Sequence, residues 1–475
     1  MHDLRRQALE SGKTVSRKAQ SRISSRASSA ANSRTNSRNA SRHASDDEDT
    51  MSDCTNWSMN SLNERLAAEV PEDASEAWKE DLANRIEEII NRKRSSTQGR
   101  ESALNLYVYY LMNHYAYDET RHKAGELFPA FLKSIKADGT EKETCLALRG
   151  QFSMQLWKSQ ASLILFSAIA LTLITVPSET AYAGLFQPLK VLYTDSRFPS
   201  VKATAIHTLG AAAIFGGAAD GEIEDIMDDL LEVIESDGSS VEAADIGEVV
   251  TAACQVWGFL ATSVDDMEEK TEAAIEAFVE QLESTDTKVQ VAVGQNIALL
   301  YEKSYTEREE GDGAAPAMER ISDDATYEEI SAIYHVEKSW VKRYEVYRQK
   351  YQLEQTLSQL ATESSKRIGK KDRKTLHANF TDILHAVEHP TLGPRYSMAR
   401  DKEGRVYGSR MTVKLRDFGL LQIDKWWKLH RFQSLKRILG GGFITHYEEN
   451  EVVVETLPAI LMNSDSDEEG YGASD

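Results

Sequence analysis

Three segments of this chain repeat one pattern of small and apolar residues, and the repeat constrains the fold more than any other feature. The segments are residues 201–210, 249–258 and 289–298, which begin 48 and 40 residues apart. Their average spacing of about 44 residues lies within the period of HEAT and armadillo repeats. A single repeat cannot bury its apolar face alone, so the repeats have to stack continuously. The pattern predicts a mainly α-helical, armadillo- or HEAT-like solenoid.

Acidic helices alternate with these apolar segments. Apolar residues from Ile223 to Ile234 keep helical spacing, while Asp and Glu fill the opposite face. A calcium site is the alternative interpretation, but the EF-hand order of ligands and its glycine position are missing. The pattern therefore favours a solvated acidic face.

Composition divides the chain into four parts. We expect a disordered Ser/Arg-rich arm at 1–61, the helical repeat domain at 62–362, a small basic α+β domain at 363–460, and a disordered acidic tail at 461–475. The arm and the tail carry too little apolar surface to offset their ordering entropy.

The basic part contains several expected elements. A charged helix is predicted from 336 to about 362, and an amphipathic helix follows the basic cluster and stops at His389-Pro390. Two short β-like runs are expected at 405–407 and 411–415. A last helix is predicted from about 424 to 439, before Gly440-Gly441-Gly442.

One apolar run could be mistaken for a membrane span. Residues 161–176 hold no charge, but this run of 16 residues is shorter than the roughly 20 that a spanning helix needs. We expect a buried core helix and no membrane association. With no secretory signal among the first 30 residues, a cytoplasmic or nuclear location, or both, is expected.

No motif points to catalysis. The sequence has no Gly-rich phosphate loop, no His pair at metal spacing and no nucleophile motif. The three cysteines lack metal or redox spacing, and Cys145 and Cys254 are interpreted as core residues. His207 is interpreted as a core or groove histidine. We therefore expect a binding protein, with no enzymatic activity, cofactor, metal or small-molecule substrate.

Charge is segregated along the chain. Residues 203–287 hold 21 Asp and Glu against a single Lys, whereas residues 338–437 hold 23 Lys and Arg against 10 acids, a net of +13. Segregated charge of this kind produces a patch that can hold a polyanion, although the whole chain has a formal net charge of −21 at pH 7. The charge pattern favours a partner that is large and phosphate-rich, such as a structured RNA, over a small substrate.

Ten basic residues of this region are candidate RNA contacts. They are Lys366, Arg367, Lys370, Lys371, Arg373, Lys374, Lys428, Arg431, Lys436 and Arg437. The cluster at 366–374 could also be a nuclear import signal or a solvated helix start. The pair Trp426-Trp427 could stack on an unpaired base or anchor the core of a small domain.

Both ends of the chain hold candidate phosphorylation sites. In the arm, several serines lie three residues after an arginine, and acidic residues follow Ser45 and surround the serines of the tail. The candidates are Ser25, Ser29, Ser37, Ser41, Ser45, Ser464 and Ser466. Phosphorylation would turn a weakly RNA-attracting arm neutral or acidic; an unregulated solubilising tail is the alternative.

Specific segments resemble the interferon-related developmental regulator family. Residues 361–374 and the stretch from Trp426-Trp427-Lys428 to Gly442 resemble its C-terminal domain, and residues 93–102 and 141–149 resemble its helical-repeat domain. The resemblance spans roughly residues 63–460. It implies an armadillo-like N-terminal domain, a small C-terminal domain and a regulatory rather than enzymatic function.

The resemblance leaves two roles open. One is the binding of ribosomes to hold them translationally silent, and the other is transcriptional co-regulation in the nucleus, with protein partners on the solenoid. The charge map favours the first. A third possibility is a transport-type adaptor whose solenoid groove holds basic peptides against its acidic face.

The chain departs from the family pattern at residues 150–167. This stretch interrupts what otherwise reads as one repeat helix, running from residues 146–149 into residues 168–173. A genuine insertion and a translated intron are both consistent with it. If an intron was translated, transcripts crossing the junction lack the corresponding 54 nucleotides, three for each of the 18 residues. Reads that all retain these nucleotides would establish the insertion instead.

Deleting residues 1–50 is expected to leave the thermal unfolding midpoint of the remaining chain essentially unchanged, since the arm has almost no large apolar residues to contribute to a core. Circular dichroism during heating measures this. A cooperative loss of helicity in the truncated chain would contradict an independent arm.

Overall fold

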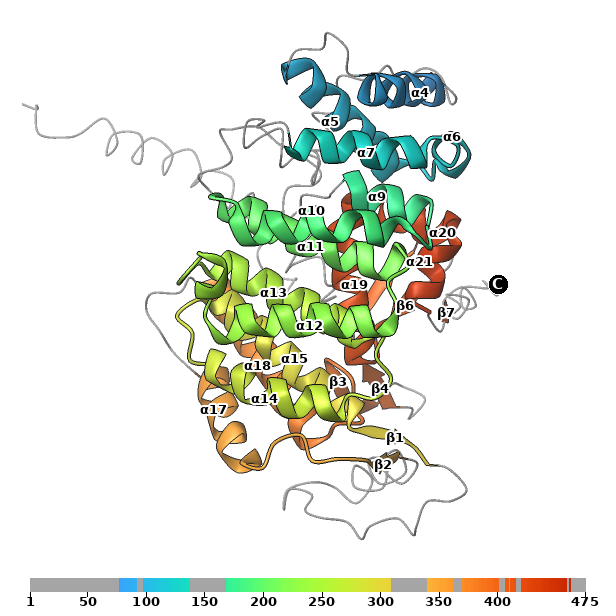
Figure 1. Ribbon diagram of the computed structural model, residues 1–475. Coiled ribbons are helices and arrows are strands. Elements are labelled where there is room, and N and C mark those ends of the chain that lie inside the picture. Colours follow the sequence, from blue (N-terminus) through green and yellow to red (C-terminus); the bar gives the residue numbers. More distant parts are fainter. Residues whose placement is uncertain are drawn as a thin grey trace, which may run out of the picture. The chain divides into compact units, whose positions relative to one another are not determined.

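A computed structural model describes nine stretches of the chain (Figure 1). They are residues 77–91, 97–136, 168–308, 340–362, 370–400, 406–409, 411–415, 420–458 and 461–462. The predicted arm at 1–61, the stretch 150–167 and nearly all of the acidic tail lie outside these residues.

Helices dominate the described residues, as the repeat pattern predicts. Before the basic region they are α4 (Ala77–Ile90), α5 (Thr97–Asn113), α6 (Tyr117–Thr120), α7 (Ala124–Lys136), α9 (Ala168–Thr175), α10 (Ala181–Asp195), α11 (Pro199–Phe215), α12 (Asp220–Glu235), the 3₁₀ turn η3 (Ser239–Val241), α13 (Gly247–Ala261), α14 (Glu268–Gln281) and α15 (Thr287–Lys303). Helices α11, α13 and α15 pack in sequence, and α10, α12 and α14 each pack on the helix that follows them. This two-layer stacking is that of a helical solenoid.

The three repeated segments occupy equivalent positions. Each begins at the third residue of its helix, in α11, α13 and α15 respectively. Their small residues permit close stacking, as expected. A Cβ on Gly210 would lie 2.6 Å from Cγ1 of Val256, and one on Gly258 would lie 2.3 Å from Oδ1 of Asn296. The repeat thus sets the distance between neighbouring helices.

The acidic helices are amphipathic, as predicted. In α12, Ile226, Met227 and Leu230 are fully buried, whereas Asp225 and Asp228 are exposed. The fold is therefore mainly α-helical, a solenoid in which α11, α13 and α15 form one layer and α10, α12 and α14 the other. Acidic residues are concentrated on α12 and α14.

Helix α9 is the described part of the charge-free run at 161–176. All eight of its residues are buried, which confirms a core helix for this part. No helix within the described ranges has the length and hydropathy to cross a membrane. Cys254 is also fully buried, as predicted, and burial raises the pKa of its thiol. Cys145 lies outside the described residues.

Short antiparallel strands complete the structure. They form the pairs β1 (Tyr305–Glu307) with β2 (Trp340–Lys342) and β3 (Tyr396–Arg400) with β4 (Val406–Ser409), and the three-stranded sheet β5 (Thr412–Lys414), β6 (Leu420–Gln422) and β7 (Leu461–Met462). Strands β4 and β5 match the two predicted β-like runs.

The helix predicted from 336 to 362 is partly wrong. Its described part begins with strand β2, and helix α17 covers only Lys350–Thr362. The reason is long-range pairing, because Val341 is the partner of Thr306 in β1. The backbone N–H of Arg343 also donates to the carbonyl of Ser304 at 2.8 Å.

The remaining helices belong to the basic region. They are α18 (Lys370–Glu388), α19 (Trp426–Leu439), the 3₁₀ turn η4 (Gly440–Gly442), α20 (Phe443–Glu449) and α21 (Glu451–Thr456). Helix α18 ends before His389-Pro390 and α19 before Gly440, which has a φ of 54°, as predicted. Helix α18 packs on both α17 and α15, so one hydrophobic core continues across the predicted boundary at residue 362.

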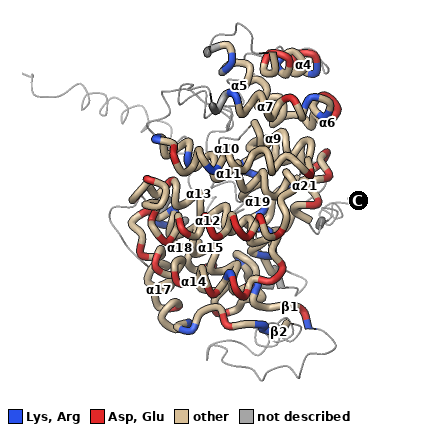
Figure 2. The backbone as a smooth tube through the Cα atoms, viewed as in Figure 1, with Lys and Arg blue, Asp and Glu red and all other residues tan. Residues whose placement is uncertain are grey.

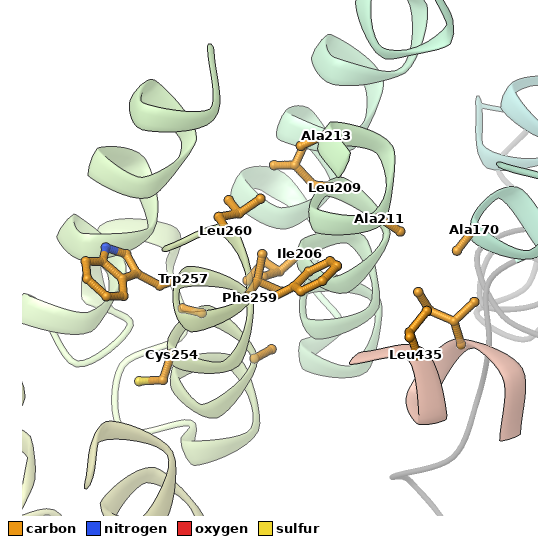
Figure 3. Close-up of a cluster of buried hydrophobic side chains, with 14 of the residues drawn as sticks. Ala170, Ile206, Leu209, Ala211, Ala213, Cys254, Trp257, Phe259, Leu260 and Leu435 are labelled. Atoms are coloured by element: carbon orange, nitrogen blue, oxygen red, sulfur yellow. The ribbon is translucent and has the colours of Figure 1, made fainter. Parts of the chain in front are cut away.

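Helix α19 lies against the solenoid and packs on α9, α13 and α15. Figure 3 shows Leu435 of α19 beside Ala170 of α9 and Ala211 of α11. Residues of α9, α13 and α15 are thereby joined to a helix that follows them by more than a hundred positions.

A buried carboxylate fixes the start of α19. Glu302 of α15 accepts hydrogen bonds from the backbone N–H groups of Trp426, at 2.8 Å, and Trp427, at 3.0 Å. The N-cap residue Lys425 provides no side-chain cap, so Glu302 satisfies two N–H groups that the helix leaves open. Burial raises the pKa of Glu302, while Lys425 and the two N–H groups act in the opposite direction.

Three further polar side chains join the C-terminal segment to backbone carbonyls. Nε2 of His430 lies 3.3 Å from the carbonyl of Gln295, and Nε2 of His446 lies 2.7 Å from that of Leu111. Asn450 donates to the carbonyl of Ile174 at 3.0 Å. Because a carbonyl only accepts, both histidines carry their proton on Nε2. Burial lowers the pKa of each to about 4.

Glu302→Ala is expected to destabilise the protein by about 2–4 kcal/mol, because two buried N–H groups lose their acceptors. Urea unfolding followed by circular dichroism measures this. Glu276→Ala removes an exposed carboxylate of α14 and serves as the control, with an expected change within about 0.5 kcal/mol. Equal midpoints for the two variants would contradict the capping role.

Stability is expected to fall as the pH drops from about 6.5 towards 4. His430 and His446 have folded-state pKa values of about 4 against an ordinary value of 6.5, so the unfolded chain binds more protons in this window. Each histidine contributes at most about 3 kcal/mol. In His446→Gln, the glutamine amide can still donate a hydrogen bond to the carbonyl of Leu111, but the side chain does not titrate. A pH series of urea midpoints should be less steep for this variant; identical slopes would contradict the assignment.

Candidate nucleic-acid interface

The basic cluster at 366–374 leads into helix α18. Lys366 and Arg367 lie outside the described residues, whereas Lys370 and Lys371 form the first two positions of the helix. Arg373 is half-buried and Lys374 is exposed. The start of α18 therefore places four basic residues within five consecutive positions, of which Lys374 certainly faces solvent.

The basic cluster begins a helix with one buried side. Leu376, Phe380, Ile383 and Val387 are buried, and Ile383 contacts Gly294 of α15 closely enough that an added Cβ there would lie 2.6 Å from it. This face fixes the helix on the solenoid, as the amphipathic pattern predicts.

Arg431 makes contacts within the protein. Its guanidinium donates to Oγ1 and the carbonyl of Thr262 at 2.9 and 3.1 Å, and to the carbonyl of Thr456 at 3.1 Å. Thr262 is the C-cap of α13, where carbonyls are left open and positive charge is favourable. Arg431 thus joins α19 to the end of a repeat helix and to α21.

The two tryptophans, Trp426 and Trp427, differ in burial and in the residues that contact them. Trp426 is buried, which confirms core packing for this residue. Trp427 is half-buried, and its ring is covered by Arg431 at 4.9 Å and Lys428 at 5.6 Å. These cation–π contacts occupy the ring surface on which a base would have to stack.

The other cations of α19 also have neighbours in the protein. Lys428 is buried and donates to Asp424 at 2.6 Å. Arg437 is half-buried and donates to Oε1 of Gln255 of α13 at 2.6 Å. Lys436 is half-buried, with its ammonium 5.5 Å from the ring of Phe432. An RNA contact for these residues stays a prediction, but their described contacts already explain Lys428, Arg431 and Arg437 structurally.

The acidic helices lie on a different part of the solenoid. Figure 2 shows Asp and Glu along α12 and α14, on the layer that does not carry α19. Lys270 of α14 pairs with Asp228 at 2.9 Å and with Glu224 at 3.6 Å, both of α12. The segregation of charge seen in the sequence therefore persists between the helices of the fold.

The adaptor hypothesis places a basic peptide against the acidic face, which belongs to α12 and α14. Helix α19 packs on the other layer, on α13 and α15, so this hypothesis stays a prediction. The candidate phosphorylation sites, Ser25, Ser29, Ser37, Ser41, Ser45, Ser464 and Ser466, lie outside the described residues. Among the residues that are described, no group of three or more His, Cys, Asp or Glu side chains could hold a metal ion.

The residues that position the C-terminal segment could not be recognised from local sequence patterns. Glu302, His430, His446 and Asn450 act on groups that are 124 to 335 positions away. A polar residue inside an apolar helical stretch, as Glu302 is in α15, is the one local signal that points to a buried partner.

The sequence of this chain is similar to those of known proteins over most of its length. The Interferon-related developmental regulator (IFRD) family matches residues 50–388. An uncharacterised protein of Schizosaccharomyces pombe is 28% identical over 380 residues, covering 80% of this chain and 74% of its own length.

Two relatives carry the family's name. Interferon-related developmental regulator 2 of Mus musculus is 22% identical over 434 residues, with 87% of this chain and 82% of that protein covered. Interferon-related developmental regulator 1 of the same species is 24% identical over 216 residues, which cover 44% of this chain and 36% of that protein. Because the family matches well over half of the residues, the chain belongs to the interferon-related developmental regulator family.

Proposed function

We propose that this protein is a non-enzymatic regulator of translation that binds ribosomes or other structured RNA through the basic start of α18. Membership of the family indicates a regulatory protein rather than an enzyme. The observation that carries the finer proposal is the cluster Lys370, Lys371, Arg373 and Lys374 at the start of α18, where Lys374 is exposed. The buried face of α18 fixes this helix on the solenoid.

Electrostatics supports RNA as the partner. Lys and Arg that neutralise phosphates release condensed counterions, which drives binding at low salt. The acidic layer of α12 and α14 repels RNA and so orients the molecule with its basic end towards the phosphates. Folded RNA is recognised mainly through its shape and backbone, for which clustered cations suffice.

A nuclear co-regulator that binds proteins through the solenoid is the second candidate. The acidic layer favours it, since exposed carboxylates of α12 and α14 could pair with a basic protein. In that case the cluster at 366–374 would serve as an import signal.

The RNA proposal predicts steep salt dependence and a strict dependence on the α18 cluster. With about six phosphate contacts, affinity should fall on the order of 10³-fold between about 50 and 200 mM salt. Replacing Lys370, Lys371, Arg373 and Lys374 with Glu should abolish co-sedimentation with ribosomes in sucrose gradients. Circular dichroism should show an unchanged helical signal, and the variant that retains Arg373 should show the same loss.

A matched control variant tests whether ribosome binding depends on the α18 cluster or only on the net charge of the protein. Lys133, Arg197, Lys288 and Arg348 are exposed and scattered, and their replacement with Glu changes the net charge equally. This control should still sediment with ribosomes, in an RNase-sensitive manner. Co-sedimentation of the α18 variant, or a wild-type protein that stays at the top of the gradient at low salt, would overturn the proposal in favour of the co-regulator.

A further inference from the structure

A small recess lies between the repeat helices and α19. Five polar residues line it, namely Thr204, His207, Thr208, Ser434 and Arg437, and its other five lining residues are apolar. None of the ten is acidic. The wall of this recess therefore holds a guanidinium group without a carboxylate, in a chain whose net charge is −21.

The two arginines of α19 differ in how well their donors are satisfied. Arg431 makes three hydrogen bonds to neutral oxygens. For Arg437 the acceptor found among the described residues is the amide oxygen of Gln255, at 2.6 Å. A guanidinium has five N–H donors, so Arg437 retains donors on the side of the recess. Burial lowers its pKa to about 10, which leaves it charged at neutral pH.

A second donor is present in the same recess. Ser434 is 6% exposed, and within the described part of the chain its hydroxyl has no recorded hydrogen bond. The hydroxyls of Thr204 and Thr208 donate to the carbonyls of Ser200 and Thr204, at 2.6 and 2.8 Å. Arg437 and Ser434, one helical turn apart on α19, are therefore two donors that can face a ligand in the recess.

We propose that this recess binds an oxoanion, with Arg437 as the charged donor and Ser434 as the second donor. Phosphate and carboxylate groups match the planar fork of an arginine and accept charge-assisted hydrogen bonds from it. An anion also compensates a buried cation, which water does only partly. This site is separate from the proposed RNA contact on α18.

Equilibrium dialysis of radiolabelled orthophosphate against the full chain tests the proposal, at pH 7 and constant ionic strength. We expect one saturable phosphate per chain. Arg437→Gln should weaken binding at least about tenfold, and Ser434→Ala several-fold, in line with lost charge-assisted and neutral hydrogen bonds. Lys436→Gln removes the neighbouring cation of α19 and should bind like the wild type.

Competition distinguishes the two sources of the anion. Displacement by sulfate but not by acetate supports a phosphate-type ligand, and displacement by acetate at similar concentration supports a carboxylate. Equal binding by Arg437→Gln and the wild type, or no saturable binding of any of the three anions to the wild type, overturns the proposal. If Arg437→Gln fails to fold, phosphate binding by Ser434→Ala decides the test. Weaker binding than that of the wild type supports the proposal, and equal binding overturns it. The variant with Glu at the four basic positions of the α18 cluster should bind phosphate like the wild type. The phosphate experiment therefore tests the recess independently of the RNA proposal.

Discussion

The carboxylate of Glu302 joins the two halves of the structure. It comes from the last of the three repeat helices and receives the backbone N–H groups of Trp426 and Trp427 in the interior. An uncompensated carboxylate would be expensive there, as the rise in its pKa shows. Compensation comes from the helix start itself, whose open N–H groups and dipole favour negative charge. The position of α19, and with it the contacts of Arg431 and His430, depends on this capping interaction.

The solenoid could be predicted because its signals are local. The repeated segments fall at the same position in α11, α13 and α15, and Pro390 and Gly440 mark helix ends that the structure confirms. Strand β2 was missed because it pairs with a strand about 35 positions earlier, and helical periodicity does not reveal such pairing. The partners of Glu302 and Arg431 lie 124 and 169 positions away, beyond any local pattern.

The candidate site, like the fold, could be predicted from the sequence only in part. Charge counting locates the basic region in the sequence, but it could not separate cations at the start of α18 from cations that fasten α19. Arg431 and Lys428 cover Trp427 and bind nearby oxygens, so their charge serves packing. A basic residue in an apolar helix is ambiguous from sequence alone, because the same side chain can neutralise open helix carbonyls or face a phosphate.

The contacts of the C-terminal segment also determine when the fold can be completed during synthesis. His446 binds a carbonyl 335 positions earlier, and Asn450 one 276 positions earlier. Domains generally begin to fold from the N-terminus as the chain emerges. Here the faces of α5 and α9 that receive these residues stay uncovered until almost the whole chain has been made. The nascent protein therefore passes through a long interval in which its apolar repeat layer is open to chaperones.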